Sequence, residues 1–112
     1  HARDFTYIDD IVAGVVDVID NPPEKQNGKP AYRIFNIGRG ASVELMDFIA
    51  ILEKCLGKKA IIDFKPMQKG DVEKTWASTD ALHALSGYEA KVPVEEGVLR
   101  FVDWYKDYFN VA

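Results

Sequence analysis

Two polar positions in this sequence combine side-chain types that could bind a phosphorylated ligand. Arg3 stands at the head of an aromatic and β-branched segment, and the polar loop 66–71 ends in Asp71. A guanidinium fork can bind a pair of phosphate oxygens, and a carboxylate can accept hydrogen bonds from a vicinal diol such as a ribose. Spacing alone also leaves a plainer interpretation open, because surface arginines and aspartates in turns are common.

The other reactive side chains predict neither catalysis nor metal binding. His1 and His83 are not spaced as a metal-binding pair, and Cys55 lies on an expected helix without a histidine partner, so we interpret it as a small buried apolar residue. No tyrosine is followed four residues later by a lysine, and Gly38-x-Gly40 lacks the third glycine of a dinucleotide-binding loop. We therefore expect no catalytic, cofactor-binding or metal-ligating residue in this chain.

Three carboxylates, those of Asp4, Asp9 and Asp10, cluster near the first segment. Paired carboxylates can carry out acid–base chemistry or bind a metal ion. We favour the simpler interpretation that Asp9 or Asp10 caps a helix and that the others are solvated.

Composition limits the class of protein. The chain has 112 residues, is 47% hydrophobic and 29% charged, carries a net charge of −4 and contains one cysteine. These values argue against a disordered chain, a disulfide scaffold and a general nucleic-acid binder. No apolar run is long enough to span a bilayer, and no signal peptide opens the chain. We expect a cytoplasmic protein without nucleic-acid or membrane partners that buries roughly 65% of its unfolded surface.

Apolar spacing predicts a mixed α/β fold with short strands and about four helices, in the order β-α-β-α-β-(β)-α-α. Strands are expected at residues 5–8, 32–37 and 60–64, with a further short strand possible at 75–77. Helices are expected between Asp10 and Asn21, between Ser42 and Gly57, at residues 81–86, and from Val94 to Phe109. Ser42 is an expected N-cap, and Gly57 and Gly87 are expected to end their helices.

Several segments together resemble one enzyme family over nearly the whole chain. Arg3–Ile11 and Tyr32–Gly38 are similar to motifs of extended short-chain dehydrogenase/reductase enzymes that act on nucleotide sugars. Val43–Ile49, Pro66–Val72 and the end of the chain from Val94 are similar to UDP-glucuronate 4-epimerases in particular. The resemblance implies that residues 1–112 are a single C-terminal substrate-binding domain, a fragment of a larger protein whose Rossmann domain is absent here.

The resemblance also implies roles for individual residues. The family arginine that contacts the diphosphate of the UDP-sugar corresponds to Arg3, and the aspartate that contacts the ribose corresponds to Asp71. Several relatives carry a phosphate-binding arginine three residues before that aspartate. This chain has the uncharged Gln68 there, so its substrate-binding role carries over more weakly, and Lys69 could supply a charge without a fork.

The implied activity belongs to the parent protein. It is the NAD-dependent interconversion of UDP-glucuronate and UDP-galacturonate at C4, although nucleotide-sugar decarboxylases and dehydratases share much of this half. The glycine fingerprint for NAD and the Tyr-x-x-x-Lys pair are missing, so the isolated chain is expected to bind no NAD and to be inactive. The alternative is a non-catalytic binding or self-association module. We expect a UDP-sugar ligand, which the isolated chain should bind weakly at best, and homo-oligomers that form through the surface exposed by the missing domain.

Overall fold

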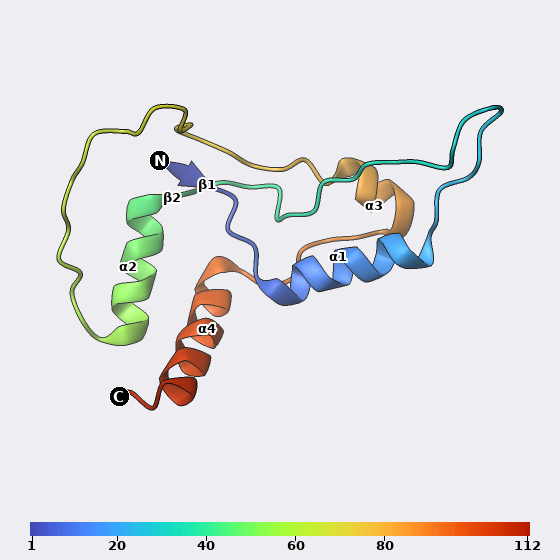
Figure 1. Ribbon diagram of the computed structural model, residues 1–112. Coiled ribbons are helices and arrows are strands. Elements are labelled where there is room, and N and C mark those ends of the chain that lie inside the picture. Colours follow the sequence, from blue (N-terminus) through green and yellow to red (C-terminus); the bar gives the residue numbers. More distant parts are fainter.

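Four helices and one two-stranded sheet form the regular structure of the chain, which a computed structural model describes from residue 1 to residue 112 (Figure 1). The helices are α1 (Ile8–Asp20), α2 (Leu45–Leu56), α3 (Asp80–Ser86) and α4 (Val94–Tyr108), and the strands are β1 (Ala2–Arg3) and β2 (Val43–Glu44). The strands pair antiparallel, with Ala2 opposite Glu44 and Arg3 opposite Val43. The mixed α/β class with four helices is confirmed.

The ends of the helices follow the sequence in part. Gly57 and Gly87 end α2 and α3 in the left-handed conformation, with φ of 68° and 75°, as expected for residues that lack a Cβ. Pro93 precedes α4 as expected. The two expected side-chain caps are wrong, because the N-cap positions are Tyr7 for α1 and Glu44 for α2, and neither makes a side-chain capping bond.

The expected strands at 5–8, 32–37, 60–64 and 75–77 are wrong. Tyr7 already caps α1, and the first strand lies earlier, at Ala2–Arg3. Residues 32–37 and 60–64 have strand-like composition but no neighbouring strand to take up their backbone hydrogen bonds, so they run as extended connections. Lys74, just before 75–77, forms only an isolated parallel bridge to Ala2.

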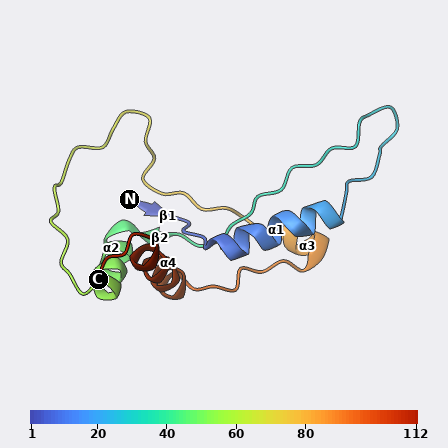
Figure 2. The same cartoon turned by 60° about the horizontal axis from the view of Figure 1, so that its bottom comes forward.

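The main apolar core lies between α2 and α4, which are side by side in Figures 1 and 2. Val94, Val98 and Val102 of α4 are buried there. The ring of Phe5 stacks on that of Phe48 with 3.9 Å between centroids. The partly buried side chains packed against this core are those of Phe5, Val43, Phe48, Ile51, Leu52 and Cys55. Cys55 therefore contributes to apolar packing, as its position on a helix suggested.

Much of the chain lies outside any core. Only 11 of 112 residues are buried, and the accessible surface is 8794 Å², whereas a self-contained monomer of this mass exposes about 6,200 Å². The chain thus buries about half of its unfolded surface, and the expectation of roughly 65% is wrong. Figure 2 shows why: the connections between α1 and β2 and between α2 and α3 loop far out from the helices. The radius of gyration of 17.9 Å exceeds the value of about 13 Å for a compact domain of this length.

Large apolar side chains accordingly face outward on the helices. On α1 these are Ile8, Val12, Val15, Val16 and Ile19, and on α4 they include Phe101, Trp104 and Tyr108. None of the four helices is both long and apolar enough to cross a membrane. These exposed faces are the surfaces on which another part of a protein, or another copy, could pack.

A second, polar contact attaches α1 to the segment that leads into α4. Asp10 is only 5% exposed, and its carboxylate accepts hydrogen bonds from the backbone N–H groups of Lys91 and Val92, each at 3.0 Å. The hydroxyl of Tyr88 donates to the carbonyl oxygen of Asp10 at 3.0 Å. The buried carboxylate of Asp10 thus links α1 to the segment before α4 by hydrogen bonds. It neither caps a helix nor lies in solvent, so both expectations for Asp10 are wrong. Asp9, in contrast, is exposed and lies 3.5 Å from Arg100.

This contact predicts a pH dependence of stability. Burial, followed by the charges of Asp10 and Asp17, raises the pKa of Tyr88 above its ordinary value of 10.0. Because the folded pKa exceeds the unfolded one, the stabilisation is complete below about pH 10 and is lost as the pH rises through the folded pKa. We expect the free energy of unfolding in urea to fall across this alkaline range, and to fall less steeply in Tyr88→Phe. Equal slopes in the two proteins would contradict the assignment.

Candidate functional site

The two side chains singled out for ligand binding meet in the structure. Nη2 of Arg3 donates a hydrogen bond to Oδ1 of Asp71, with 2.9 Å between the two atoms, although the residues are 68 positions apart in the sequence. Oδ1 also accepts the N–H of Val72 at 3.0 Å, and Nε2 of His1 lies 3.4 Å from Oδ2. The fold therefore brings together the guanidinium and the carboxylate that the sequence analysis considered for a diphosphate and a diol.

This ion pair remains open to solvent. The side chains of Arg3 and Asp71 are 30% and 43% exposed, and ion pairs of this kind contribute about 0–1 kcal/mol to stability. A guanidinium has five N–H donors, and Arg3 uses one on Asp71 and one on the carbonyl oxygen of Ala2. Arg3 can therefore accept further anionic partners without a large loss of folding energy.

Gln68 lies in the turn that presents Asp71. Its carbonyl oxygen accepts the N–H of Asp71 at 3.2 Å, and Gly70 takes a φ of +85° in the same turn, which favours glycine. The side chains of Gln68 and Lys69 form no hydrogen bond or ion pair within the chain. The turn thus brings all three residues to one loop, but only Asp71 touches Arg3.

A pocket of about 280 Å³ lies beside Arg3. It is lined by Arg3, Asp4, Thr6, Ile37, Gly38, Thr75, Trp76 and Ala77. Trp76 is 59% exposed, and the ammonium group of Lys74 lies 5.4 Å from its ring centroid. Sequence reasoning overlooked Trp76, and its only signal was a large aromatic side chain in a polar stretch just after Asp71. The pocket combines a cation with an exposed aromatic ring, a surface suited to a phosphorylated ligand that also carries a flat ring.

The carboxylate of Asp4 forms one wall of this pocket. It accepts hydrogen bonds from the backbone N–H groups of Arg39, Gly40 and Ala77 and from the hydroxyl of Thr6, at 3.0–3.3 Å. The expectation that Asp4 is solvated is therefore wrong. Sequence spacing could not show this, because the partners of Asp4 lie up to 73 positions away.

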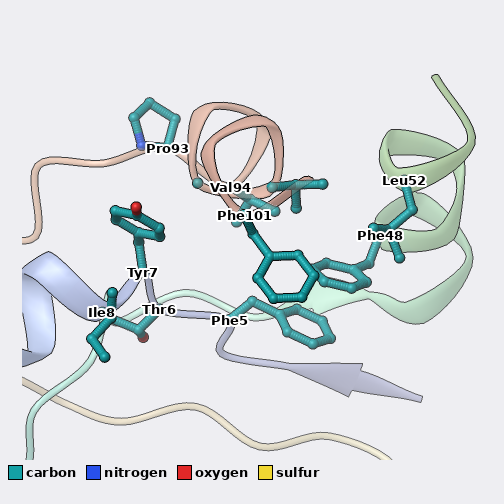
Figure 3. A pocket seen from close by; sticks show the side chains of 11 residues that line it. Phe5, Thr6, Tyr7, Ile8, Phe48, Leu52, Pro93, Val94 and Phe101 are labelled. Atoms are coloured by element: carbon teal, nitrogen blue, oxygen red, sulfur yellow. The ribbon is translucent and has the colours of Figure 1, made fainter. Parts of the chain in front are cut away.

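A larger pocket, of about 420 Å³, lies between α2, α4 and the segment before α1. Figure 3 shows the rings of Phe5, Phe48 and Phe101 gathered at one end, with Tyr7 and Pro93 at the other. No charged side chain lines it, so it offers nothing to a phosphate. We regard it as incompletely filled packing between helices. No group of three or more His, Cys, Asp or Glu side chains is placed to hold a metal ion.

Comparison with known proteins gives consistent results. No family model matches the chain. It is 43% identical over 123 residues to a probable UDP-glucuronate 4-epimerase of Rhizobium meliloti, covering 99% of this chain and 36% of that protein. It is 38% identical to UDP-glucuronate 4-epimerase 5 of Arabidopsis thaliana, covering 97% of this chain and 27% of that protein. The chain thus spans about a third of the length of the curated relatives it matches.

Solved structures agree with these relatives. A UDP-glucuronic acid 4-epimerase from Bacillus cereus, in complex with UDP-glucuronic acid and NAD, superposes with a TM-score of 0.79 at 30% identity, covering 96% of this chain and 32% of that one. A UDP-glucose 4-epimerase from Bifidobacterium longum, in complex with NAD⁺ and UDP, reaches a TM-score of 0.84 at 22% identity, covering 97% and 31%. The second likeness concerns the fold alone.

Proposed function

The chain belongs to the extended short-chain dehydrogenase/reductase family, in which it matches a C-terminal portion of the nucleotide-sugar epimerases. From this we propose that the chain is the part of a longer protein that binds the UDP-sugar. In this proposal residues 1–112 form one substrate-binding domain. The observation that carries it is the meeting of Arg3 and Asp71 at 2.9 Å, where Arg3 also lines a pocket.

Each residue has a distinct task in this proposal. Arg3 donates its free N–H groups to the diphosphate, and Asp71 accepts hydrogen bonds from the ribose hydroxyls. Gln68, on the same turn, can donate or accept a hydrogen bond but carries no charge, so its share of the binding energy is smaller. The bound diphosphate competes with Asp71 for Arg3, and the exposure of the pair makes that exchange inexpensive.

We propose that the longer protein interconverts UDP-glucuronate and UDP-galacturonate at C4 with NAD. Relatives named UDP-glucuronate 4-epimerase support this. The residues of this chain do not fit NAD, because a dinucleotide needs a glycine-rich turn that opens directly onto a helix N-terminus. Here the Gly38–Gly40 turn is bound to Asp4 and is followed by β2. The nicotinamide chemistry therefore belongs to residues outside this chain.

The role of Arg3 is tested by Arg3→Ala in the full-length protein. Losing charge-assisted hydrogen bonds to the diphosphate should weaken UDP binding, measured by calorimetry, by about 10- to 100-fold. Arg33→Ala is the matched control, because Arg33 is exposed and lies over the Phe35 ring at 4.5 Å, outside the pocket. Unchanged UDP affinity in Arg3→Ala would refute the proposed role.

The division of labour predicts an inactive chain. The purified 112-residue chain, supplied with NAD and UDP-glucuronate, should form no UDP-galacturonate, because it lacks both a NAD site and a Tyr-x-x-x-Lys pair. The full-length protein should form it under the same conditions. Chromatography of the sugar nucleotides would monitor the reaction. Formation of UDP-galacturonate by the isolated chain would overturn this part of the proposal.

The exposed apolar faces support a second proposal, that the isolated chain self-associates into homo-oligomers. Val12, Val15, Val16 and Ile19 form a continuous outward face on α1, and an uncovered face of this kind drives association. Light scattering should show a mass that rises with concentration, and Val12→Asp with Val16→Asp should reduce it. A monomer at all concentrations would contradict the proposal.

A further inference from the structure

The carboxylate next to Arg3 has no task in the proposed function. We propose that Asp4 is a positioning residue for Arg3, because its carboxylate holds together the chain segments that form the diphosphate pocket. This inference rests on the proposed role of Arg3 in phosphate binding. The carboxylate oxygens of Asp4 line the pocket, but the chain itself already binds them, so they would make no hydrogen bond to the ligand.

The hydrogen bonds of Asp4 show why it is a positioning group. Oδ1 accepts the N–H of Arg39 at 3.1 Å and the hydroxyl of Thr6 at 3.3 Å. Oδ2 accepts the N–H groups of Gly40 at 3.0 Å and Ala77 at 3.2 Å. A carboxylate has about four lone-pair sites, so the protein itself occupies them all. Asp4 therefore has no acceptor left for a metal ion, a substrate hydroxyl or a proton in transfer.

Nothing else of this kind joins the two segments. No backbone–backbone hydrogen bond connects the Gly38–Gly40 turn to residues 75–77. Both segments donate their N–H groups to Asp4 instead. One carboxylate therefore supplies the hydrogen bonds that link these two segments, both of which line the pocket of about 280 Å³.

Gly38 provides independent evidence that this approach is close. A Cβ at this position would lie 2.9 Å from Oδ2 of Asp4 and 3.2 Å from Cβ of Ala77. The backbone of Gly38 does not need positive φ, so the glycine is required for space alone. The turn thus fits directly against the carboxylate that holds it.

The consequence for Arg3 follows from its two chain neighbours. On one side, Ala2 donates its N–H to the carbonyl oxygen of Glu73 at 2.7 Å and accepts the N–H of Thr75 at 3.0 Å. On the other side, Asp4 binds the N–H of Ala77. Both neighbours of Arg3 therefore hold the segment that directly follows Asp71, and the guanidinium is kept within reach of the pocket. Of these two attachments to residues 73–77, only that of Ala2 is independent of the Asp4 charge.

The test compares Asp4→Asn, Arg3→Ala and the double variant in the full-length protein, with UDP binding measured by calorimetry. Asn has the size of Asp but loses the charge and turns an amide N–H₂ toward the backbone donors. We expect Asp4→Asn to weaken UDP binding about three- to tenfold, comparable to one ordinary hydrogen bond. Because Asp4 acts through Arg3, Asp4→Asn should cause no further loss when Arg3 is already alanine.

Asp10→Asn is the matched control. Asp10 also accepts two backbone N–H groups from distant positions, but it does not line the pocket beside Arg3. Both variants should lower the midpoint of urea unfolding, and only Asp4→Asn should change UDP affinity. A purely structural role for Asp4 predicts instead that the two variants bind UDP equally well.

The outcomes separate this inference from the proposed function. Wild-type UDP affinity in Asp4→Asn, or a loss that adds fully to that of Arg3→Ala, overturns the positioning role while leaving Arg3 as a ligand. Unchanged affinity in Arg3→Ala overturns the proposed function itself. If Asp4→Asn does not fold, Gly38→Ala takes its place. Its Cβ displaces the intact carboxylate, so the same non-additive loss supports the inference and unchanged affinity overturns it.

Discussion

The carboxylate of Asp4 accepts backbone N–H groups from two segments that lie 35 to 73 positions further along the chain. In most domains such segments are held by a core or a sheet, but here only 11 of 112 residues are buried and the sheet has two short strands. Around Arg3, charge-assisted hydrogen bonds to Asp4 therefore hold the neighbouring segments together where little apolar packing is available. Asp10 acts in the same way between α1 and the segment before α4.

The scarcity of buried surface and the exposed helix faces fit the proposal that this chain acts as part of a longer protein. The chain spans about a third of its curated relatives, and in the proposed longer protein other residues would cover the apolar faces seen here. Arg3, Asp4 and Asp71 form a polar cluster, whereas α1 and α4 carry exposed apolar side chains. In the proposed function the polar cluster binds the ligand and the apolar faces are interfaces.

The sequence predicted the helices well and the strands poorly, and the reason is physical. Helix α4 and the glycine ends of α2 and α3 depend on local spacing and local conformation, which the sequence shows directly. Residues 32–37 and 60–64 have strand-like composition, but a strand needs a partner, and none lies beside them. Arg3 and Asp71 were predicted from their side-chain types and the family resemblance. The roles of Asp4 and Asp10 depend on contacts across the fold, which no spacing reveals.

The central claim is that the diphosphate of a UDP-sugar is bound by residues of this chain. A crystal structure of the full-length protein with UDP-glucuronate tests it most directly. We predict the guanidinium of Arg3 within hydrogen-bonding distance of a phosphate oxygen, the carboxylate of Asp71 near the ribose, and Asp4 still bound to the Gly38–Gly40 turn. A nucleotide bound elsewhere, with Arg3 still paired only to Asp71, would contradict the claim.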